Sequence, residues 1–155
     1  MNKYIRIILY VLVIWWMVIV FCFSHQESLQ STATSNQAIE IILNVLNIND
    51  MDLTEKQEII KNLQLPIRKL AHFILYFVGG TILYLFFSTT KYSAKKRIGA
   101  AFGVAVIYSM FDECHQVFVP GRAGQITDVC IDSLGALVGI VIMYLIINMV
   151  YKKEV

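Results

Sequence analysis

The residues from Asp112 to Arg122 carry most of the chemistry that this chain could perform. They supply two carboxylates, an imidazole, an amide and a guanidinium, in the order Asp112, Glu113, His115, Gln116 and Arg122. A carboxylate beside a histidine is typical of general acid–base catalysis, and arginine is typical of phosphate or carboxylate binding. The stretch closes a strongly apolar run, where unpaired charges are costly and usually mark function. We therefore expect a catalytic or anion-binding site here.

A second set of polar residues opens the apolar run that begins at residue 67. Residues four apart share a helical face, so Arg68, His72 and Tyr76 form one stripe. Arg68 and Lys69 could merely extend their charged ends to a membrane surface. By helical rise, His72 lies about 6 Å deeper in the membrane than Arg68. Taken alone, it is interpreted equally well as a structural, hydrogen-bonded histidine or as a functional one.

A third set begins the last apolar run, where Asp128 and Asp132 are again four apart. By helical rise Asp132 lies about 6 Å inward from Asp128, and Asp112 lies about 10 Å inward from Val119. The polar groups of all three runs therefore fall in one layer, and residues 77–87, 98–111 and 133–150 hold no charged side chain. A transporter or proton channel needs polar groups through the whole depth of the membrane, so this class is disfavoured.

Four apolar runs must position these residues. The chain has 155 residues, of which 57% are hydrophobic, and its mean hydropathy of +0.64 is too high for a soluble domain of this size. The runs at residues 5–23, 67–87, 98–119 and 127–150 approach or exceed the roughly 20 residues that cross a hydrocarbon core. We predict an all-α membrane protein with four transmembrane helices, which forms a single domain over residues 1–155.

The distribution of Lys and Arg predicts that both termini are cytoplasmic. With four crossings, the bases before residue 7, at 91–97 and at 152–153 fall on one side, which the positive-inside rule makes cytoplasmic. The other side then carries ten of the eleven acidic residues. We interpret residues 5–23 as a permanent anchor and not a signal peptide, because the apolar stretch is long and no small-residue cleavage site follows it. The charge pattern does not indicate nucleic-acid binding.

Residues 24–66 form the one sizeable extracytoplasmic segment, and they predict two short helices. Thr34 with Gln37, and Thr54 with Gln57, fit the capping box that starts a helix. The apolar face of each helix is expected to lie on protein or on lipid headgroups, and a lid over a substrate is the alternative.

Small residues predict where the membrane helices approach one another closely. Gly99 with Gly103, and Gly135 with Gly139, have the Gly-xxx-Gly spacing that lets two helix backbones come together. The spacing permits such an approach at Gly99 and Gly103, and we expect tight packing against a neighbouring helix at Gly135 and Gly139.

Two interpretations of the polar layer stay open. In the structural interpretation, the acids form ion pairs with Arg68, Lys69 and Arg122, and these pairs hold the helices together. Against it, burying ion pairs costs free energy, and small residues already allow the helices to pack closely. In the functional one, which we favour, these bases hold an anionic headgroup or phosphate, while a histidine oriented by a carboxylate acts as general acid or base. The catalytic candidates are Asp112, His115, His72 and Asp128, with Gln116, Tyr76, Asp132 and Glu113 on the binding side.

Two details limit these roles. Glu113 is rotated about 100° from Asp112 on a helix, so the two carboxylates need not address the same partner. A metal site is a weaker variant of the hypothesis, because the spacing matches neither His-Glu-x-x-His nor a Cys/His zinc pattern. Its ligands would come from Asp112, His115, Asp128 and Asp132. We predict no metal, and the sequence leaves any cofactor open.

Four ordered motifs resemble the VanZ-like family and together cover nearly the whole chain. They are Phe23-Ser24-His25-Gln26, Arg68-Lys69-x-x-His72-Phe73-x-x-Tyr76, Asp112-Glu113-x-His115-Gln116-x-Phe118-Val119-Pro120-Gly121-Arg122 and Asp128-x-x-x-Asp132-x-x-Gly135. The resemblance implies a small polytopic protein of the bacterial cytoplasmic membrane, in a family whose founding member is linked to low-level resistance to the glycopeptide teicoplanin. Ser-Ser-Gln is more usual in the first motif, so His25 is not expected to be essential. The resemblance supports the site and implies no mechanism.

These observations lead to one function and one alternative. We expect a cell-envelope protein whose outer-leaflet polar pocket binds, and in a stronger form modifies, an anionic lipid-linked molecule such as a peptidoglycan precursor. The partner is thus a membrane lipid or a lipid-linked envelope precursor. The alternative is a non-catalytic shield or interaction protein, which uses the same residues for lipid or partner binding and for helix packing. The sequence leaves open whether the chain is an enzyme, and what its oligomeric state is.

Overall fold

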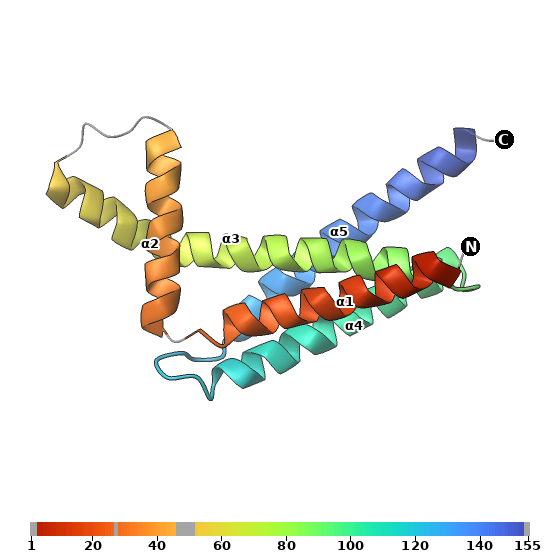
Figure 1. Cartoon of the computed structure of the whole chain (residues 1–155), viewed down its shortest axis with the longest axis horizontal. Coiled ribbons are helices and arrows are strands. Elements are labelled where there is room, and N and C mark those ends of the chain that lie inside the picture. Colours follow the sequence, from red (N-terminus) through yellow and green to blue (C-terminus); the bar gives the residue numbers. More distant parts are fainter. Residues whose placement is uncertain (1–2, 27, 46–51, 154–155) are drawn as a thin grey trace.

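Five helices make up the part of the chain that the computed structural model describes, which is residues 3–26, 28–45 and 52–153. No strand occurs within these ranges, so the predicted all-α class is confirmed. In Figure 1, α1 and α4 run antiparallel to α3 and α5, and α2 crosses one end of this bundle. The helices are α1 (Lys3–Ser24), α2 (Ser28–Val45), α3 (Leu53–Ser88), α4 (Ala94–Gln116) and α5 (Ile126–Lys153).

Three of these helices are long and apolar enough to cross a membrane, namely α1, α3 and the Ile126–Val150 part of α5. The predicted third membrane helix does form, as α4, but it falls outside this set. Asp112, Glu113 and His115 interrupt its apolar sequence near the C-terminal end. These polar residues, which are candidates for the functional site, thus help to make α4 the least hydrophobic of the four expected spans.

The long helix α3 differs from the prediction, because it joins two helices that the sequence divides. Pro66 lies inside it, where we expected a break before a membrane helix starting at residue 67. Proline removes one backbone hydrogen bond, and the carbonyl of Asn62 that would accept it lies on an exposed turn where water or headgroups can satisfy it. The axis of α3 changes direction as it passes α2 (Figure 1), which is the usual effect of an internal proline. At its start, Asp52 caps the helix by accepting a hydrogen bond from the Leu53 amide at 2.8 Å.

The crossing helix α2 starts earlier than its capping box suggests. It begins at Ser28, ahead of the predicted start near Thr34. Ile39 and Leu43 are buried, so its apolar face lies on protein as expected. α2 packs against α3, where Gln64 donates a hydrogen bond to Asn36 at 2.7 Å. The stretch 46–51 of the predicted extracytoplasmic segment lies outside the described residues.

Close packing of α5 against α3 sets the geometry of the bundle. A Cβ atom at Gly139 would lie 2.1 Å from the Phe77 carbonyl oxygen, and one at Gly135 would lie 2.4 Å from that of Phe73. Since no real Cβ approaches a backbone atom so closely, the prediction for this glycine pair is confirmed. Gly99 and Gly103 do not make such a contact, because no atom of the described residues lies within 4 Å of the corresponding Cβ positions.

Candidate functional site

The polar stripe of α3 runs from the surface into the bundle. Arg68 is partly exposed, His72 is 13% exposed, and Tyr76 is fully buried. Trp16 of α1 packs edge-on against the Tyr76 ring, with the ring centroids 5.5 Å apart. The stripe predicted from the four-residue spacing therefore exists, and it places an imidazole at the boundary between the surface and the core.

On α4, Asp112 is buried and has hydrogen-bond donors at only one of its two carboxylate oxygens. The Ser24 hydroxyl of α1 donates to Oδ2 at 2.8 Å, and the Gln116 amide is 3.4 Å from the same atom. Gln116 also donates to the Ser24 hydroxyl at 2.8 Å. The other oxygen, Oδ1, is buried without a hydrogen-bond partner. α1 is thus tied to α4, while one face of the carboxylate is left for another group.

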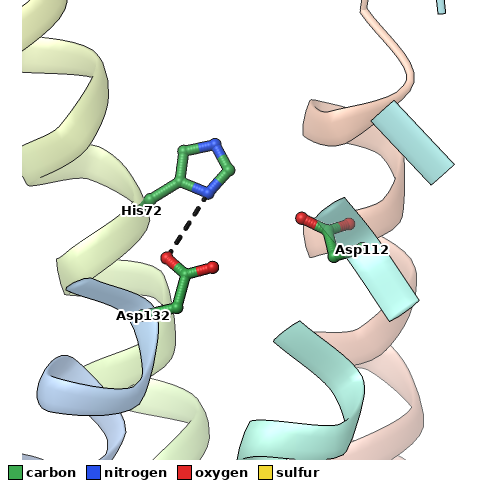
Figure 2. A group of neighbouring side chains, drawn as sticks. All are labelled: His72, Asp112 and Asp132. Atoms are coloured by element: carbon green, nitrogen blue, oxygen red, sulfur yellow. Dashed lines mark ion pairs between the residues drawn. The ribbon is translucent and has the colours of Figure 1, made fainter. Parts of the chain in front are cut away.

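On α5, Asp132 repeats this arrangement. It is fully buried, and the Ser109 hydroxyl of α4 donates to its Oδ2 at 2.9 Å. Its Oδ1 lies 3.6 Å from Nδ1 of His72, as Figure 2 shows, which is too long for a hydrogen bond. The group that faces His72 is therefore Asp132, a residue expected from the sequence on the binding side and not among the catalytic candidates.

His72, Asp112 and Asp132 form a cluster in which three helices meet, called the three-helix cluster below. One potential ligand atom from each side chain lies within 4.8 Å of those of the other two. Figure 2 shows Asp112 on α4 facing His72 of α3 and Asp132 of α5. The predicted meeting of the three polar sets in one layer thus holds for these residues.

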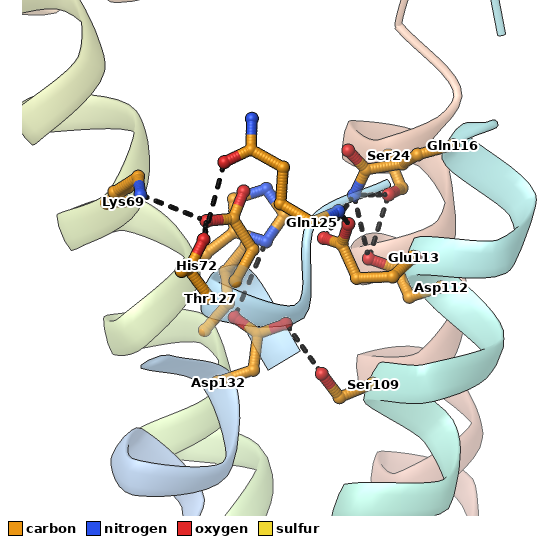
Figure 3. A network of polar contacts seen from close by, with 12 residues as sticks. Ser24, Lys69, His72, Ser109, Asp112, Glu113, Gln116, Gln125, Thr127 and Asp132 are labelled. Atoms are coloured by element: carbon orange, nitrogen blue, oxygen red, sulfur yellow. Dashed lines mark hydrogen bonds and ion pairs between the residues drawn. The ribbon is translucent and has the colours of Figure 1, made fainter. Parts of the chain in front are cut away.

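Glu113 shares the Gln116 amide with Asp112 but has a second partner of its own. Its Oε2 accepts a hydrogen bond from the Gln125 backbone amide at 2.8 Å, and its Oε1 accepts one from the Gln116 side chain at 3.1 Å (Figure 3). A Cβ at Gly124 would lie 2.6 Å from the Glu113 carbonyl oxygen, so the α4–α5 connection lies tightly on α4. The contacts of Glu113 are those of a group that holds this connection in place.

Lys69 and Asp128 form an ion pair at the surface, 3.2 Å apart with side-chain exposures of 37% and 18%. Such exposed pairs contribute about 0–1 kcal/mol to stability. Neither side chain lines the cavity of about 340 Å³ that is described below. The structure thus places this predicted base and this predicted acid opposite each other, away from that cavity.

His115 stands apart from the three-helix cluster. Its Nε2 lies 3.2 Å from Nδ1 of His25, and the two rings stack with centroids 5.4 Å apart. Phe21 packs against the same ring. Asp112 and Gln116 are buried, whereas His115 lies partly exposed against the end of α1.

A cavity of about 340 Å³ lies beside the three-helix cluster, between α2, α3 and the end of α1. We call it the arginine cavity, because Arg68 and Arg122 both line it. His72 lines it as well, and so connects it to the cluster. Its remaining wall combines hydroxyl and amide groups with apolar side chains, namely Phe23, Gln26, Ser31, Thr34, Ser35, Ala38, Ile67, Ala71, Ile74 and Leu75.

Among the described residues, the two arginines of this cavity have no carboxylate partner. Within 4.0 Å, the ion pairs of the described residues join Lys69 to Asp128 and His72 to Asp132, and neither includes an arginine. Arg122 donates instead to the Ser24 carbonyl at 3.2 Å and to the Ser31 hydroxyl at 2.8 Å, and its Nε is buried without a partner. Burial, together with the nearby guanidinium of Arg68, lowers the pKa of Arg122 from its ordinary value, although arginine keeps its charge in proteins.

Several residues of the site were not assigned a role from the sequence. Ser24 and Ser109 orient the two buried carboxylates, and Ser31 of α2 holds Arg122. Their signal is weak, since a serine in an apolar helix more often bonds its own backbone. Ser24 alone had a cue, because it belongs to the first of the four motifs.

Comparison with known proteins gives one result. The model of a family described as VanZ/LLP1 matches residues 7–148, which include every element of the site. No curated protein and no solved structure matches the chain.

Proposed function

This chain belongs to the VanZ/LLP1 family, and from that premise we propose that it binds an anionic, lipid-linked molecule in the arginine cavity. We infer further that it is a multi-pass protein of the bacterial cytoplasmic membrane, with four crossings, both termini in the cytoplasm and the cavity at the outer leaflet. The ligand class includes phosphate-bearing lipids and lipid-linked precursors of the cell envelope.

The observation that carries this proposal is the state of the two arginines. Buried or half-buried guanidinium groups normally pair with an acid, since an uncompensated charge is costly away from water. Arg68 and Arg122 line one cavity without such a partner among the described residues, although four acids lie in the same layer. A phosphate would supply the compensating negative charge, and guanidinium binds phosphate oxygens through paired hydrogen bonds.

The shape of the cavity supports a ligand with a lipid tail. Arg68 and Ile74 both line it, and they are about 9 Å apart along α3 by helical rise. Phe23 and Ile74 line the cavity and are also exposed at the surface, by 43% and 50%. A headgroup at the arginines would therefore continue into an apolar chain along Ile74 and Phe23 without turning back into water.

The arrangement of the helices supports the proposed orientation. The start of α1, the α3–α4 connection and the end of α5 lie at one end of the bundle in Figure 1. Lys91, Lys95, Lys96 and Arg97 belong to that connection and to the start of α4. Positive charge near the ends of membrane helices favours the cytoplasmic side, so the arginine cavity at the opposite end would face the outer leaflet.

The proposal has a catalytic form, in which the bound molecule is also modified. His72 is then the acid–base candidate, because it lines the arginine cavity and faces Asp132. His115 has no comparable position. The second candidate function is a non-catalytic shield or interaction protein that uses the same residues for binding and packing. Asp132→Asn separates the two, since it removes the charge but keeps a similar shape. The substitution should abolish the activity of an acid–base enzyme, whereas a protein that binds by shape should stay partly active.

The proposal is tested in a teicoplanin-sensitive bacterium that expresses the protein. Arg122→Gln and His72→Gln are compared with the wild type for drug tolerance and for the composition of membrane lipids, at matched protein levels in the membrane. Lys69→Gln is the control, because it removes the same charge from a residue outside the cavity. We expect the first two variants to lose any effect of the wild type and the control to keep it. If the wild type has an effect that all three variants retain, the cavity is not the functional site.

A further inference from the structure

We propose that the three-helix cluster of His72, Asp112 and Asp132 binds a divalent transition-metal ion. The proposal goes beyond lipid binding and does not depend on it, because neither Arg68 nor Arg122, which carry the lipid-binding proposal, is among the proposed ligands. Its basis is the pattern of hydrogen bonds that these residues leave unmade.

Both carboxylate candidates are held from one side and left open on the other. A hydroxyl from a neighbouring helix donates to Oδ2 of Asp112 and to Oδ2 of Asp132. The Oδ1 atoms of both, and Nδ1 of His72, are buried without a hydrogen-bond partner. Metal sites have this pattern, in which outer hydrogen bonds fix the carboxylates and the free atoms point at the ion.

The unsatisfied atoms are concentrated at this point. Seven buried side-chain atoms of the described residues lack a partner, and the cluster supplies three of them. A fourth is the hydroxyl of Tyr76, one turn deeper than His72 on the same face of α3. Unpartnered buried polar groups are rare in folded proteins and call for a ligand or an ordered water. Orphan atoms from three different helices would all be satisfied by one ion and its bound water.

Charge and distance both fit a divalent cation. Asp112 and Asp132 are 1% and 0% exposed, and two adjacent carboxylates without a cation are strongly disfavoured in such a place. Atoms bound to one ion lie roughly 3–5 Å apart, since each metal–ligand bond is about 2.0–2.6 Å long. The ligand atoms of the cluster lie within 4.8 Å of one another.

The donor set selects the type of metal. One imidazole with two carboxylates suits ions that accept both nitrogen and oxygen, such as Mn²⁺ or Zn²⁺, and suits Ca²⁺ and Mg²⁺ less well. Three protein ligands leave coordination positions open, as in metal sites that bind a water or a substrate. His72 lines the arginine cavity and also a small hollow of about 10 Å³ beside Gln116 and Asp128, so water-sized molecules reach the site. With Nδ1 on the metal, His72 is a ligand and not the acid–base group of the catalytic form.

Binding of Mn²⁺ tests the proposal. The full-length chain is purified in detergent and stripped of bound metals, and the signal of free Mn²⁺ is then followed by electron paramagnetic resonance during titration. We expect one tight site per chain, displaced by Zn²⁺, and binding at least about tenfold weaker in Asp132→Asn and His72→Gln. Glu113→Gln is the matched control, since it neutralises a buried acid next to Asp112 that lies outside the cluster. It should bind Mn²⁺ like the wild type.

A second measurement keeps the test independent of how well the variants fold. Mn²⁺ bound to the wild-type chain should show magnetic coupling to one imidazole nitrogen. No binding by the wild type, no nitrogen coupling, or equal binding by the wild type and His72→Gln would each overturn the proposal. Arg68→Gln should leave Mn²⁺ binding intact, so a failure of the lipid-binding proposal remains distinguishable from a failure of this one.

Discussion

Replacement of Gly135 by alanine should loosen the contact between α3 and α5 on which the site is built. The added Cβ would lie 2.4 Å from the Phe73 carbonyl oxygen, about 1 Å inside the roughly 3.5 Å at which non-bonded atoms attract best. The obstacle is backbone, so no side-chain rotation relieves it, and the helices must separate. Gly135 is one turn from Asp132, and Phe73 is next to His72, so the 3.6 Å contact of these two side chains must lengthen.

The size of the effect follows from two opposing contributions. Overpacking of this kind costs about 1–3 kcal/mol, while alanine in place of glycine favours the helix by about 1 kcal/mol. Gly103→Ala is the matched control, because nothing lies within 4 Å of its Cβ position and only the favourable contribution applies. The two variants should therefore differ in stability by about the full cost of overpacking, 1–3 kcal/mol.

Equilibrium unfolding in mixed detergent micelles, followed by the fluorescence of Trp16, measures this difference. Trp16 is buried and its indole donates to the Leu75 carbonyl at 2.9 Å, so its emission reports on packing around α3. Trp15 is 65% exposed and is replaced by Phe in all samples to isolate the signal. Equal stabilities of Gly135→Ala and Gly103→Ala would refute the close contact of α3 and α5.

Three further predictions concern single positions. Ser24→Ala should lower the free energy of unfolding by about 1–3 kcal/mol, because the buried Asp112 loses its 2.8 Å hydroxyl donor; unfolding in micelles measures it, and no change would contradict the buried hydrogen bond. Asp128→Asn should change the same quantity by under about 1 kcal/mol, since its ion pair with Lys69 is partly exposed, and a larger loss would mean that the pair is structural. Ser93→Cys, in a background without native cysteines, should resist a membrane-impermeant thiol reagent in intact cells; labelling from outside would reverse the proposed orientation.

The sequence predicts the helical class well, because long apolar runs and the need to satisfy backbone hydrogen bonds in lipid leave few alternatives. It also predicts the layer in which His72, Asp112 and Asp132 meet, since helical rise fixes the depth of each residue. The sequence divides α3 at residue 66 because the apolar run begins at residue 67, but the helix continues through Pro66, whose lost hydrogen bond falls on an exposed turn. The helix therefore runs on from the polar segment into the apolar run without a break.

The sequence does not predict which polar side chains of the layer contact each other. Spacing places Asp128 and Asp132 on one face of α5, but only the rotation of α5 against α3 decides that Asp132 faces His72 and that Asp128 faces Lys69. The same rotation decides which glycines pack, since Gly135 meets a backbone and the identically spaced Gly103 meets nothing. Both outcomes depend on how the side chains of several helices pack together, which the spacing along one helix does not determine.

The most direct test of the central claim is the affinity of the chain, in lipid nanodiscs of neutral phosphatidylcholine, for a polyprenyl diphosphate and for phosphatidylglycerol. Loss of one charge-assisted contact is worth about 1.5–3 kcal/mol, so Arg68→Gln and Arg122→Gln should each weaken binding by roughly 10- to 150-fold. Lys69→Gln removes the same charge from the neighbouring position and should have little effect. Selective loss in the two arginine variants is the result predicted for an anion site in the arginine cavity. Equal affinities in all three variants and the wild type would contradict it.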